Sequence, residues 1–102
     1  MHAALLELLP SGSASIEAVS KRLGTSTRTL QRRLSREQSN FQAVLNKTRE
    51  DLARYYLKTS DMSGAEISFL LGFEDPNSFF RAFHAWTGET PEKVRGGLQA
   101  AR

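Results

Sequence analysis

Two segments of the sequence share one pattern: Val19-Ser20-Lys21-Arg22-Leu23-Gly24 and, 48 residues later, Ile67-Ser68-Phe69-Leu70-Leu71-Gly72. Each begins with a β-branched residue, has a serine in second place and ends in a leucine and a glycine that can turn the chain. When one residue is inserted after the second glycine, the register extends to three further pairs: Leu30 with Phe79, Arg32 with Arg81, and Leu34 with Phe83. The repeat predicts two copies of a helix, a glycine turn and a second helix.

The serine of each copy, Ser20 or Ser68, is small enough to face the crossing of the two helices and to let them pack at a steep angle. Helices that cross in this way form a helix-turn-helix unit. A generic small helical bundle is the alternative, because a short helix, a glycine and another helix recur in many α proteins.

Proline and glycine divide the rest of the chain into further helical segments, and no alternating or β-branched run predicts a strand. We expect an all-α domain of about seven helices. The expected helices cover residues 3–9, 16–23, 26–38, 41–58, 63–71 and 75–86, with a short last helix from Thr90. Two helix-turn-helix subdomains, residues 1–40 and 59–102, are thus joined by a linker helix over 41–58.

Local signals set the ends of these helices. Ser15 is placed to cap the second helix, Ser63 and Glu66 form a capping box, and Asp75-Pro76 opens the sixth helix. Gly96-Gly97 is typical of a helix stop, which leaves residues 98–102 as a frayed tail.

Apolar residues at helical spacing predict the faces that turn inward. On the shorter helices they are Ile16, Val19, Leu23, Leu30, Leu34, Phe79, Phe83 and Trp86. On the linker helix the inward face comprises Phe41, Val44, Leu45, Thr48, Leu52, Tyr55 and Tyr56.

The third expected helix carries a concentrated positive charge, with four arginines and one glutamate between Ser26 and Glu37. Arg28, Gln31, Arg32 and Ser35 share one face, and Arg33 and Arg36 flank it. Arginine pairs in bidentate fashion with guanine and glutamine with adenine, so Arg28, Gln31 and Arg32 are candidates for reading base edges in DNA. A solvated basic helix face is the alternative.

The sixth expected helix is nearly neutral, and its outward face comprises Asn77, Ser78, Phe80, Arg81 and His84. We expect Arg81 to supply the main base contact, and Asn77 and Ser78 to contact backbone or base edges. Phe80 would either touch a thymine methyl group or be buried. Contacts to the DNA backbone or flanks are expected from Thr27, Ser35, Arg36, Phe80, His84 and Lys47.

Several other cations are candidates for binding phosphates without reading sequence: Lys21, Arg22, Arg49, Arg54, Lys93 and Arg95. For Arg49 a structural role between the two subdomains is favoured. The net charge of +3 and pI near 9.7 permit nucleic-acid binding, although many unrelated small proteins are as basic.

An enzyme, an exported protein and a membrane protein are all disfavoured. The two histidines, His2 and His84, belong to no cluster at metal or triad spacing, phosphate-binding glycine loops are missing, and no cofactor is expected. Cysteine is absent, the apolar runs are far shorter than the ~20 residues of a membrane span, and the start lacks the pattern of a signal peptide. We expect a bacterial cytoplasmic protein.

The segment 66–73, followed by 78–88 and Thr90-Pro91, resembles the signature of the AraC family of transcription regulators. The stretch 23–34 is similar to that family's first recognition helix, and Phe41, Arg49, Ala53 and Tyr56-Leu57 are similar to its connecting helix. The resemblance covers about residues 5–95 and departs from the family pattern at Phe80 and Ser20, where a small polar residue and an alanine are usual.

This resemblance implies two helix-turn-helix subdomains whose recognition helices, about residues 26–38 and 75–86, enter successive major grooves of a promoter or operator. It implies an effector-binding or dimerisation domain elsewhere in the full-length protein, and a surface that touches RNA polymerase. Two other functions stay open: a protein-interaction module that uses Phe69, Tyr55 and Tyr56, and an RNA-binding helical domain. RNA readers generally stack bases on exposed aromatic rings, whereas most aromatics here are expected to turn inward.

Overall fold

The computed structural model describes residues 2–12 and 14–100. Over those residues it contains seven α-helices, one 3-10 turn and no strand, which confirms the predicted all-α fold. The elements are α1 (His2–Leu8), η1 (Leu9–Ser11), α2 (Ile16–Arg22), α3 (Thr27–Arg36), α4 (Phe41–Thr59), α5 (Gly64–Leu70), α6 (Pro76–Thr87) and α7 (Pro91–Ala100). Among these described helices, none combines the length and the apolar character that crossing a bilayer requires.

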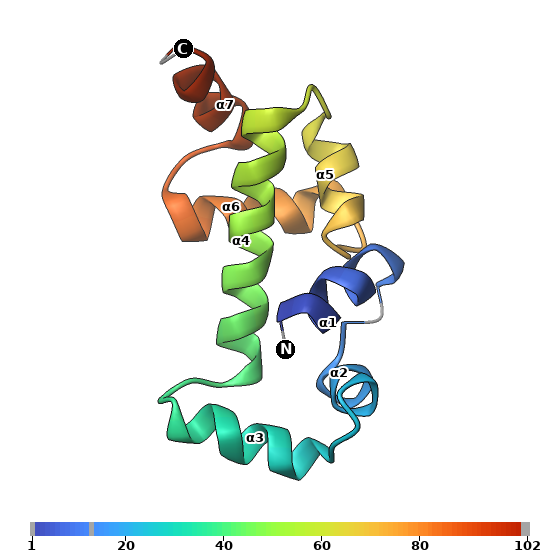
Figure 1. Ribbon diagram of the computed structural model, residues 1–102. Coiled ribbons are helices and arrows are strands. Elements are labelled where there is room, and N and C mark those ends of the chain that lie inside the picture. The colour runs from blue at the N-terminus through green and yellow to red at the C-terminus, as the bar shows by residue number, and fades with distance from the viewer. Residues whose placement is uncertain (1, 13, 101–102) are drawn as a thin grey trace.

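The 19-residue α4 is the axis of an elongated molecule of 44 × 26 × 23 Å. Figure 1 shows α2 and α3 at one end of α4, and α5, α6 and α7 around its other half. α1 packs on both α2 and α4, and α7 packs on α4. The predicted linker helix therefore exists and contacts elements from both halves of the chain.

Two separate hydrophobic clusters lie along α4. The first consists of Ala4, Leu5, Leu9, Val19, Leu30, Leu34 and Leu45, and the second of Ala53, Leu57, Ile67, Leu71, Phe79 and Phe83. Leu52 packs against both clusters. We call α1 to α3 with the first cluster the first unit, and α5 to α7 with the second cluster the second unit.

The internal repeat is present in the backbone. In the first unit, Thr25 N–H donates to the Ser20 carbonyl at 3.0 Å, and in the second unit Phe73 N–H donates to the Ser68 carbonyl at 3.1 Å. The turn glycines Gly24 and Gly72 have φ of 69° and 80°, a conformation that side chains with a Cβ rarely adopt. Both copies are thus the same helix, glycine turn and helix.

Helix caps follow the same repeat. Ser15 Oγ accepts from Ala18 N–H at the start of α2, and Ser63 Oγ accepts from Glu66 N–H at the start of α5, both at 3.1 Å. Ser63 N–H in turn donates to the Glu66 carboxylate at 3.2 Å, which completes the predicted capping box. At the corresponding places before α3 and α6, Ser26 and Asp75 are the N-caps.

Three predictions about helix faces and ends are wrong. α7 continues through Gly96-Gly97 to Ala100, so these glycines do not stop it, and residues 101–102 of the expected frayed tail lie outside the described residues. Tyr55 is 58% exposed because it lies about 200° around the helix from both Ala53 and Leu57, which are buried. Leu23, at the C-cap of α2, is 41% exposed.

Candidate nucleic-acid interface

The cationic face of α3 is available to solvent. Leu30 and Leu34 are buried in the first unit, and the opposite side of the helix exposes Arg28, Gln31, Arg32, Ser35 and Arg36, while Thr27 is half-buried. Ser26 begins the helix by accepting from Thr29 N–H at 3.1 Å. The predicted separation into an apolar and a basic face is therefore confirmed.

The arginines of α3 form no ion pair with any residue that the structure describes. Within the part of the chain that the structure describes, the ion pairs are Arg22–Glu7, Lys47–Asp51 and Arg54–Glu50, and none involves Arg28, Arg32, Arg33 or Arg36. Exposed cations without partners can release counterions from a polyanion and form bidentate bonds without first breaking an ion pair. The chemistry of this face suits a phosphate-rich ligand.

The outward face of α6 is smaller than expected. Asn77, Arg81 and His84 are exposed, whereas Ser78 is half-buried. Ser78 N–H donates to Asp75 Oδ1 at 2.8 Å, and the Ser78 hydroxyl donates to Asp75 Oδ2 at 3.1 Å. These two bonds lower the pKa of the Asp75 carboxyl, assisted by the positive charge of Arg81. The Ser78 hydroxyl thus already has a partner within the N-cap.

Phe80 packs towards α5. It is half-buried, its ring lies 5.7 Å from the Phe79 ring between centroids, and it adjoins the second cluster. A Cβ added to Gly64 would lie 2.6 Å from the Phe80 ring, so the absence of a side chain at Gly64 makes room for it. Of the two alternatives for Phe80, the structure supports burial, while its contact with a thymine methyl stays a prediction.

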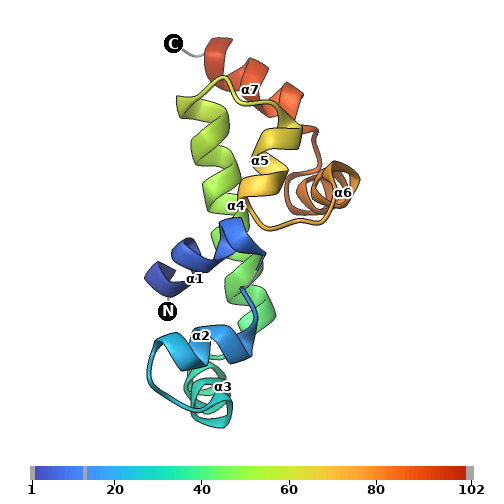
Figure 2. The ribbon, with the colours of Figure 1, turned by 90° about the vertical axis from the view of Figure 1, so that its right-hand side faces the viewer.

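The second helices of the two units have nearly the same orientation. Figure 2 views both α3 and α6 end on, and in Figure 1 both run across the long axis of α4. They are displaced from each other along α4, with α3 at one end of the molecule and α6 beside the middle. Two helices in this arrangement can face successive segments of one extended ligand.

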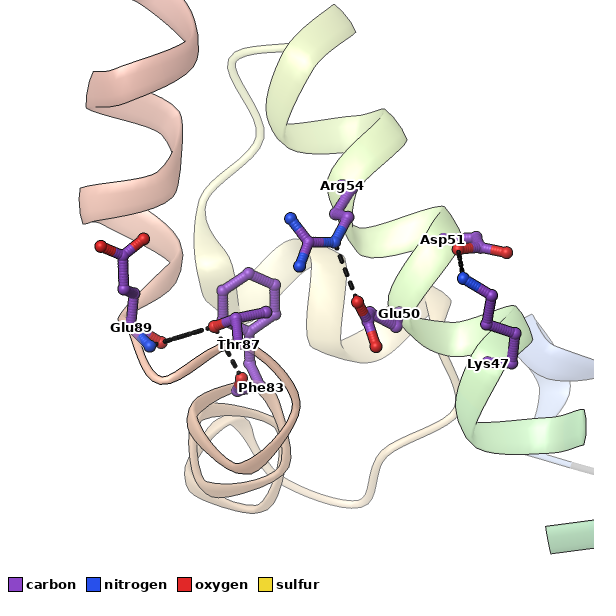
Figure 3. A network of polar contacts seen from close by, with 7 residues as sticks. All are labelled: Lys47, Glu50, Asp51, Arg54, Phe83, Thr87 and Glu89. Carbon is purple, nitrogen blue, oxygen red and sulfur yellow. Dashed lines mark hydrogen bonds and ion pairs between the residues drawn. The ribbon is translucent and has the colours of Figure 1, made fainter. Parts of the chain in front are cut away.

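The cations of α4 are in part engaged with carboxylates of the same helix. Lys47 Nζ donates to Asp51 at 3.0 Å, and Arg54 Nε donates to Glu50 at 3.0 Å, both with the i,i+4 spacing that helices favour (Figure 3). The Lys47 side chain is still 71% exposed. Such surface pairs contribute about 0.3–0.5 kcal/mol, so Lys47 can exchange its partner for a phosphate at small cost.

Arg49 has the structural role that the sequence favoured. Its Nε donates to the Leu71 carbonyl at 2.9 Å and its Nη2 to the Gly72 carbonyl at 3.5 Å. The guanidinium carbon lies 4.4 Å from the centroid of the Phe73 ring. Burial lowers the pKa of Arg49, and the carbonyls and ring around it supply negative potential to the charged form. Arg49 therefore connects α4 to the turn between α5 and α6.

Arg95, which the sequence grouped with phosphate-binding cations, is also directed inward. Its Nε donates to the Leu57 carbonyl at 3.3 Å, near the C-terminal end of α4. Lys93, two residues earlier in α7, is exposed. Among the described residues, no three His, Cys, Asp or Glu side chains come together in a way that could hold a metal ion.

The geometry of two helix-turn-helix units is matched by a known family. Residues 19–97 match the family described as helix-turn-helix domain, a segment that begins in α2 and ends in α7 and so includes the glycine turn and the second helix of both units. The chain belongs to the AraC-type helix-turn-helix domains. The resemblance indicated by the sequence is thereby confirmed.

Individual AraC-type relatives extend the match. The chain is 41% identical over 91 residues to the ornithine utilization regulator of Pseudomonas aeruginosa, which covers 89% of the chain and 27% of that protein. It is 34% identical over 93 residues to the HTH-type transcriptional regulator VirS of Mycobacterium tuberculosis, covering 89% and 27%. The chain therefore spans about a quarter of the length of these relatives. Both relatives are named as regulators, and the second is named as a regulator of transcription.

A solved structure shares the arrangement of the AraC-type helices. The DNA-binding domain of AdpA, a global transcriptional factor solved in complex with a target DNA, is 31% identical and superposes with a TM-score of 0.82 over 98% of the chain and 90% of that domain. The structure described here is thus that of the DNA-binding domain of an AraC-type transcription regulator.

Proposed function

We propose that the chain reads a specific duplex sequence by placing α3 and α6 in successive major grooves. The observation that carries this proposal is the repeat itself: the two units have the same turn, the same cap position and second helices of nearly the same orientation (Figure 2). Helix-turn-helix units on one face of B-DNA contact sites one helical turn apart, about 34–36 Å or 10–10.5 base pairs. A rigid α4 would hold the two units at that separation.

In the first unit, base reading is assigned to Arg28, Gln31 and Arg32, with Thr27, Ser35 and Arg36 on the backbone or flanks. The exposed positions of the three base-reading side chains and the absence of ion pairs at the two arginines, among the described residues, support this assignment. Each bidentate contact to a base discriminates by about 1–3 kcal/mol. The first unit would supply most of the electrostatic attraction.

In the second unit, Arg81 is assigned the main base contact and Asn77 a supporting one. Ser78, whose hydroxyl bonds Asp75, would act mainly by holding the start of α6, and His84 and Phe80 would lie at the flanks. Lys47 on α4 would contact a phosphate between the two sites. We infer that the second unit contributes fewer charged contacts than the first.

The full-length regulator is proposed to contain further parts. Because the matched relatives are more than three times as long as the aligned segment, an effector-binding or dimerisation domain is expected elsewhere in the protein. Contact with RNA polymerase at a promoter and action in the bacterial cytoplasm are likewise proposals, which follow from the regulatory role of the relatives.

Selection of binding sites from a random duplex pool tests this function. We expect an enriched site with two conserved blocks about 10 base pairs apart. Binding to that site should weaken steeply with salt, because each neutralised phosphate lowers the slope of log K against log salt by about 0.9. A folded, active sample that enriches no sequence would contradict the proposal.

The same measurement separates the two competing functions. Phe69 is 70% and Tyr55 58% exposed, which is the observation that favours a protein-interaction surface, although Tyr56 packs against the second cluster. An apolar protein interface would bind its partner with little dependence on salt. Preference for single-stranded RNA over duplex DNA would support the RNA-binding alternative.

A further inference from the structure

The two glycine turns of the repeat differ in what surrounds them. A Cβ added to Gly24, in the first unit, would have no atom within 4 Å among the described residues. A Cβ added to Gly72, in the second unit, would lie 2.5 Å from the carbonyl oxygen of Leu9 and 3.6 Å from Nη2 of Arg49. The turn that leads into α6 is therefore in close contact with η1 of the first unit and with α4.

Arg49 joins these three parts of the molecule. It lies in the middle of α4, between Thr48 and Ala53, which are buried, and its guanidinium donates to the Leu71 and Gly72 carbonyls. Those carbonyls follow the last turn of α5, where a helix leaves acceptors without internal partners. The guanidinium also lies over the Phe73 ring, which packs on both Phe79 and Trp86 of α6. A displacement of Arg49 would therefore change the position of α6.

We propose that Arg49 and the Gly72 turn form a clamp that fixes the position of α6 relative to α3, and thereby the spacing between the two DNA blocks that the domain accepts. This inference rests on the proposed bipartite reading of DNA. Neither unit needs the clamp for its own core, because each has a separate hydrophobic cluster. The clamp determines the register between the units, which is the position of α6 relative to α3 along the DNA.

Register matters because DNA is a helix. One added base pair moves the second block by about 3.4 Å along the axis and by about 35° around it, as 10–10.5 base pairs complete a turn of 34–36 Å. A rigid pair of units cannot follow that change without losing contacts in one groove. A pair whose second unit can move on α4 tolerates it better.

The first measurement compares affinities for the selected site and for the same site with one base pair inserted or deleted between the blocks. We expect wild type to bind the altered spacings at least tenfold more weakly. Arg49→Met, which keeps an apolar stem but loses both bonds and the charge, should bind the native spacing about tenfold more weakly and lose most of its discrimination, to less than threefold. Lys58→Met removes an exposed cation from the same helix, at a position with no proposed DNA contact, and should match wild type in both respects.

Arg49→Lys and the salt dependence distinguish a clamp from a phosphate contact. If Arg49 bound DNA, lysine would preserve affinity and methionine would reduce the salt slope by about 0.9. The clamp predicts that the salt slope is unchanged in both variants and that spacing discrimination is reduced even with lysine. The ammonium group of lysine cannot donate both hydrogen bonds from a planar group that stacks on the Phe73 ring. A slope reduced in Arg49→Met and restored by lysine would overturn the proposal.

A second measurement does not depend on DNA. The sequence has no cysteine, so Glu37→Cys on the α3 side and Ala85→Cys on α6 place two nitroxide labels at exposed positions. The proposal predicts a narrow distance distribution in wild type that broadens in Arg49→Met and not in Lys58→Met, with helicity retained in both variants. Equal distributions in all three proteins, or loss of helicity in both Arg49 variants, would overturn the clamp. If wild type binds all spacings equally well and the distance distribution still broadens in Arg49→Met, bipartite reading is refuted and the clamp stands.

Discussion

Ser20 and Ser68 occupy the same place in the two units, 48 residues apart, and both are at least 98% buried, yet only one hydroxyl has a partner. Ser68 Oγ donates to the Asp75 carbonyl at 3.2 Å, whereas Ser20 Oγ has no hydrogen-bond partner among the described residues. A buried polar group without a partner costs about 1–3 kcal/mol, and one with a partner contributes about 0.5–1.5 kcal/mol. The repeat therefore provides an internal comparison.

Alanine at the two positions should have opposite effects. Ser20→Ala removes the unpartnered hydroxyl and should raise the free energy of unfolding by about 0.5–1 kcal/mol, whereas Ser68→Ala should lower it by about 1 kcal/mol. Urea denaturation followed by circular dichroism measures both. Equal losses of stability at the two sites would show that Ser20 has a partner that the structure does not reveal.

Gly64 and Phe80 should be coupled. Gly64→Ala places a Cβ against the Phe80 ring and is expected to destabilise the domain by about 1 kcal/mol, at the lower end of overpacking costs. In a Phe80→Ala background the same change should become neutral or stabilising, because alanine favours a helix over glycine by up to about 1 kcal/mol. The four proteins form a double-mutant cycle in thermal or urea unfolding. A coupling energy of zero would place the Phe80 ring away from α5.

The capping box at α5 gives a third prediction. Ser63→Ala leaves Glu66 N–H without its acceptor and should cost about 1 kcal/mol of unfolding free energy. Ser63→Asp restores an acceptor at the same position and serves as the control, with stability close to wild type. An alanine variant as stable as wild type would mean that water replaces the cap without loss.

The N-cap of α6 should make stability depend on pH. Hydrogen bonds from Ser78 lower the folded pKa of Asp75, so this carboxylate stabilises the fold above its unfolded pKa of about 3.9 and loses that contribution as pH falls through the lower folded value. Asp75→Asn keeps a capping oxygen but cannot titrate. The difference in unfolding free energy between wild type and this variant should therefore shrink between pH 6 and pH 3. A difference that stays constant over this pH range would mean that the two hydrogen bonds from Ser78 do not stabilise the Asp75 carboxylate.

The sequence predicts well what short-range chemistry determines. Ser15, Ser63 and Asp75 cap the expected helices because a side-chain oxygen and the N–H groups it accepts from are three residues apart. The two glycine turns were predicted because the positive φ they require favours glycine. The buried faces of α3 and α6 were predicted because each packs against a single unit, so one apolar stripe runs along the whole helix.

Predictions failed where distant segments decide the outcome. α7 continues through Gly96-Gly97 because it packs on α4, where Arg95 bonds the Leu57 carbonyl, and such contacts offset the roughly 1 kcal/mol that each glycine costs. Tyr55 is exposed because α4 serves two cores in succession, and its inward face changes along its length. Arg49 was assigned a structural role, but its partners at Leu71 and Gly72 are 22 and 23 residues away and no local pattern identifies them.

The most direct test of bipartite reading uses Arg32→Ala and Arg81→Ala on the site selected from a random pool. Affinities are measured for the selected site and for versions with one block scrambled. If α3 and α6 each read one block, Arg32→Ala should lose discrimination at the first block only and Arg81→Ala at the second only, each by about 1–3 kcal/mol. Loss at both blocks from either variant, or no loss from Arg81→Ala, would contradict the reading of two blocks by two helices.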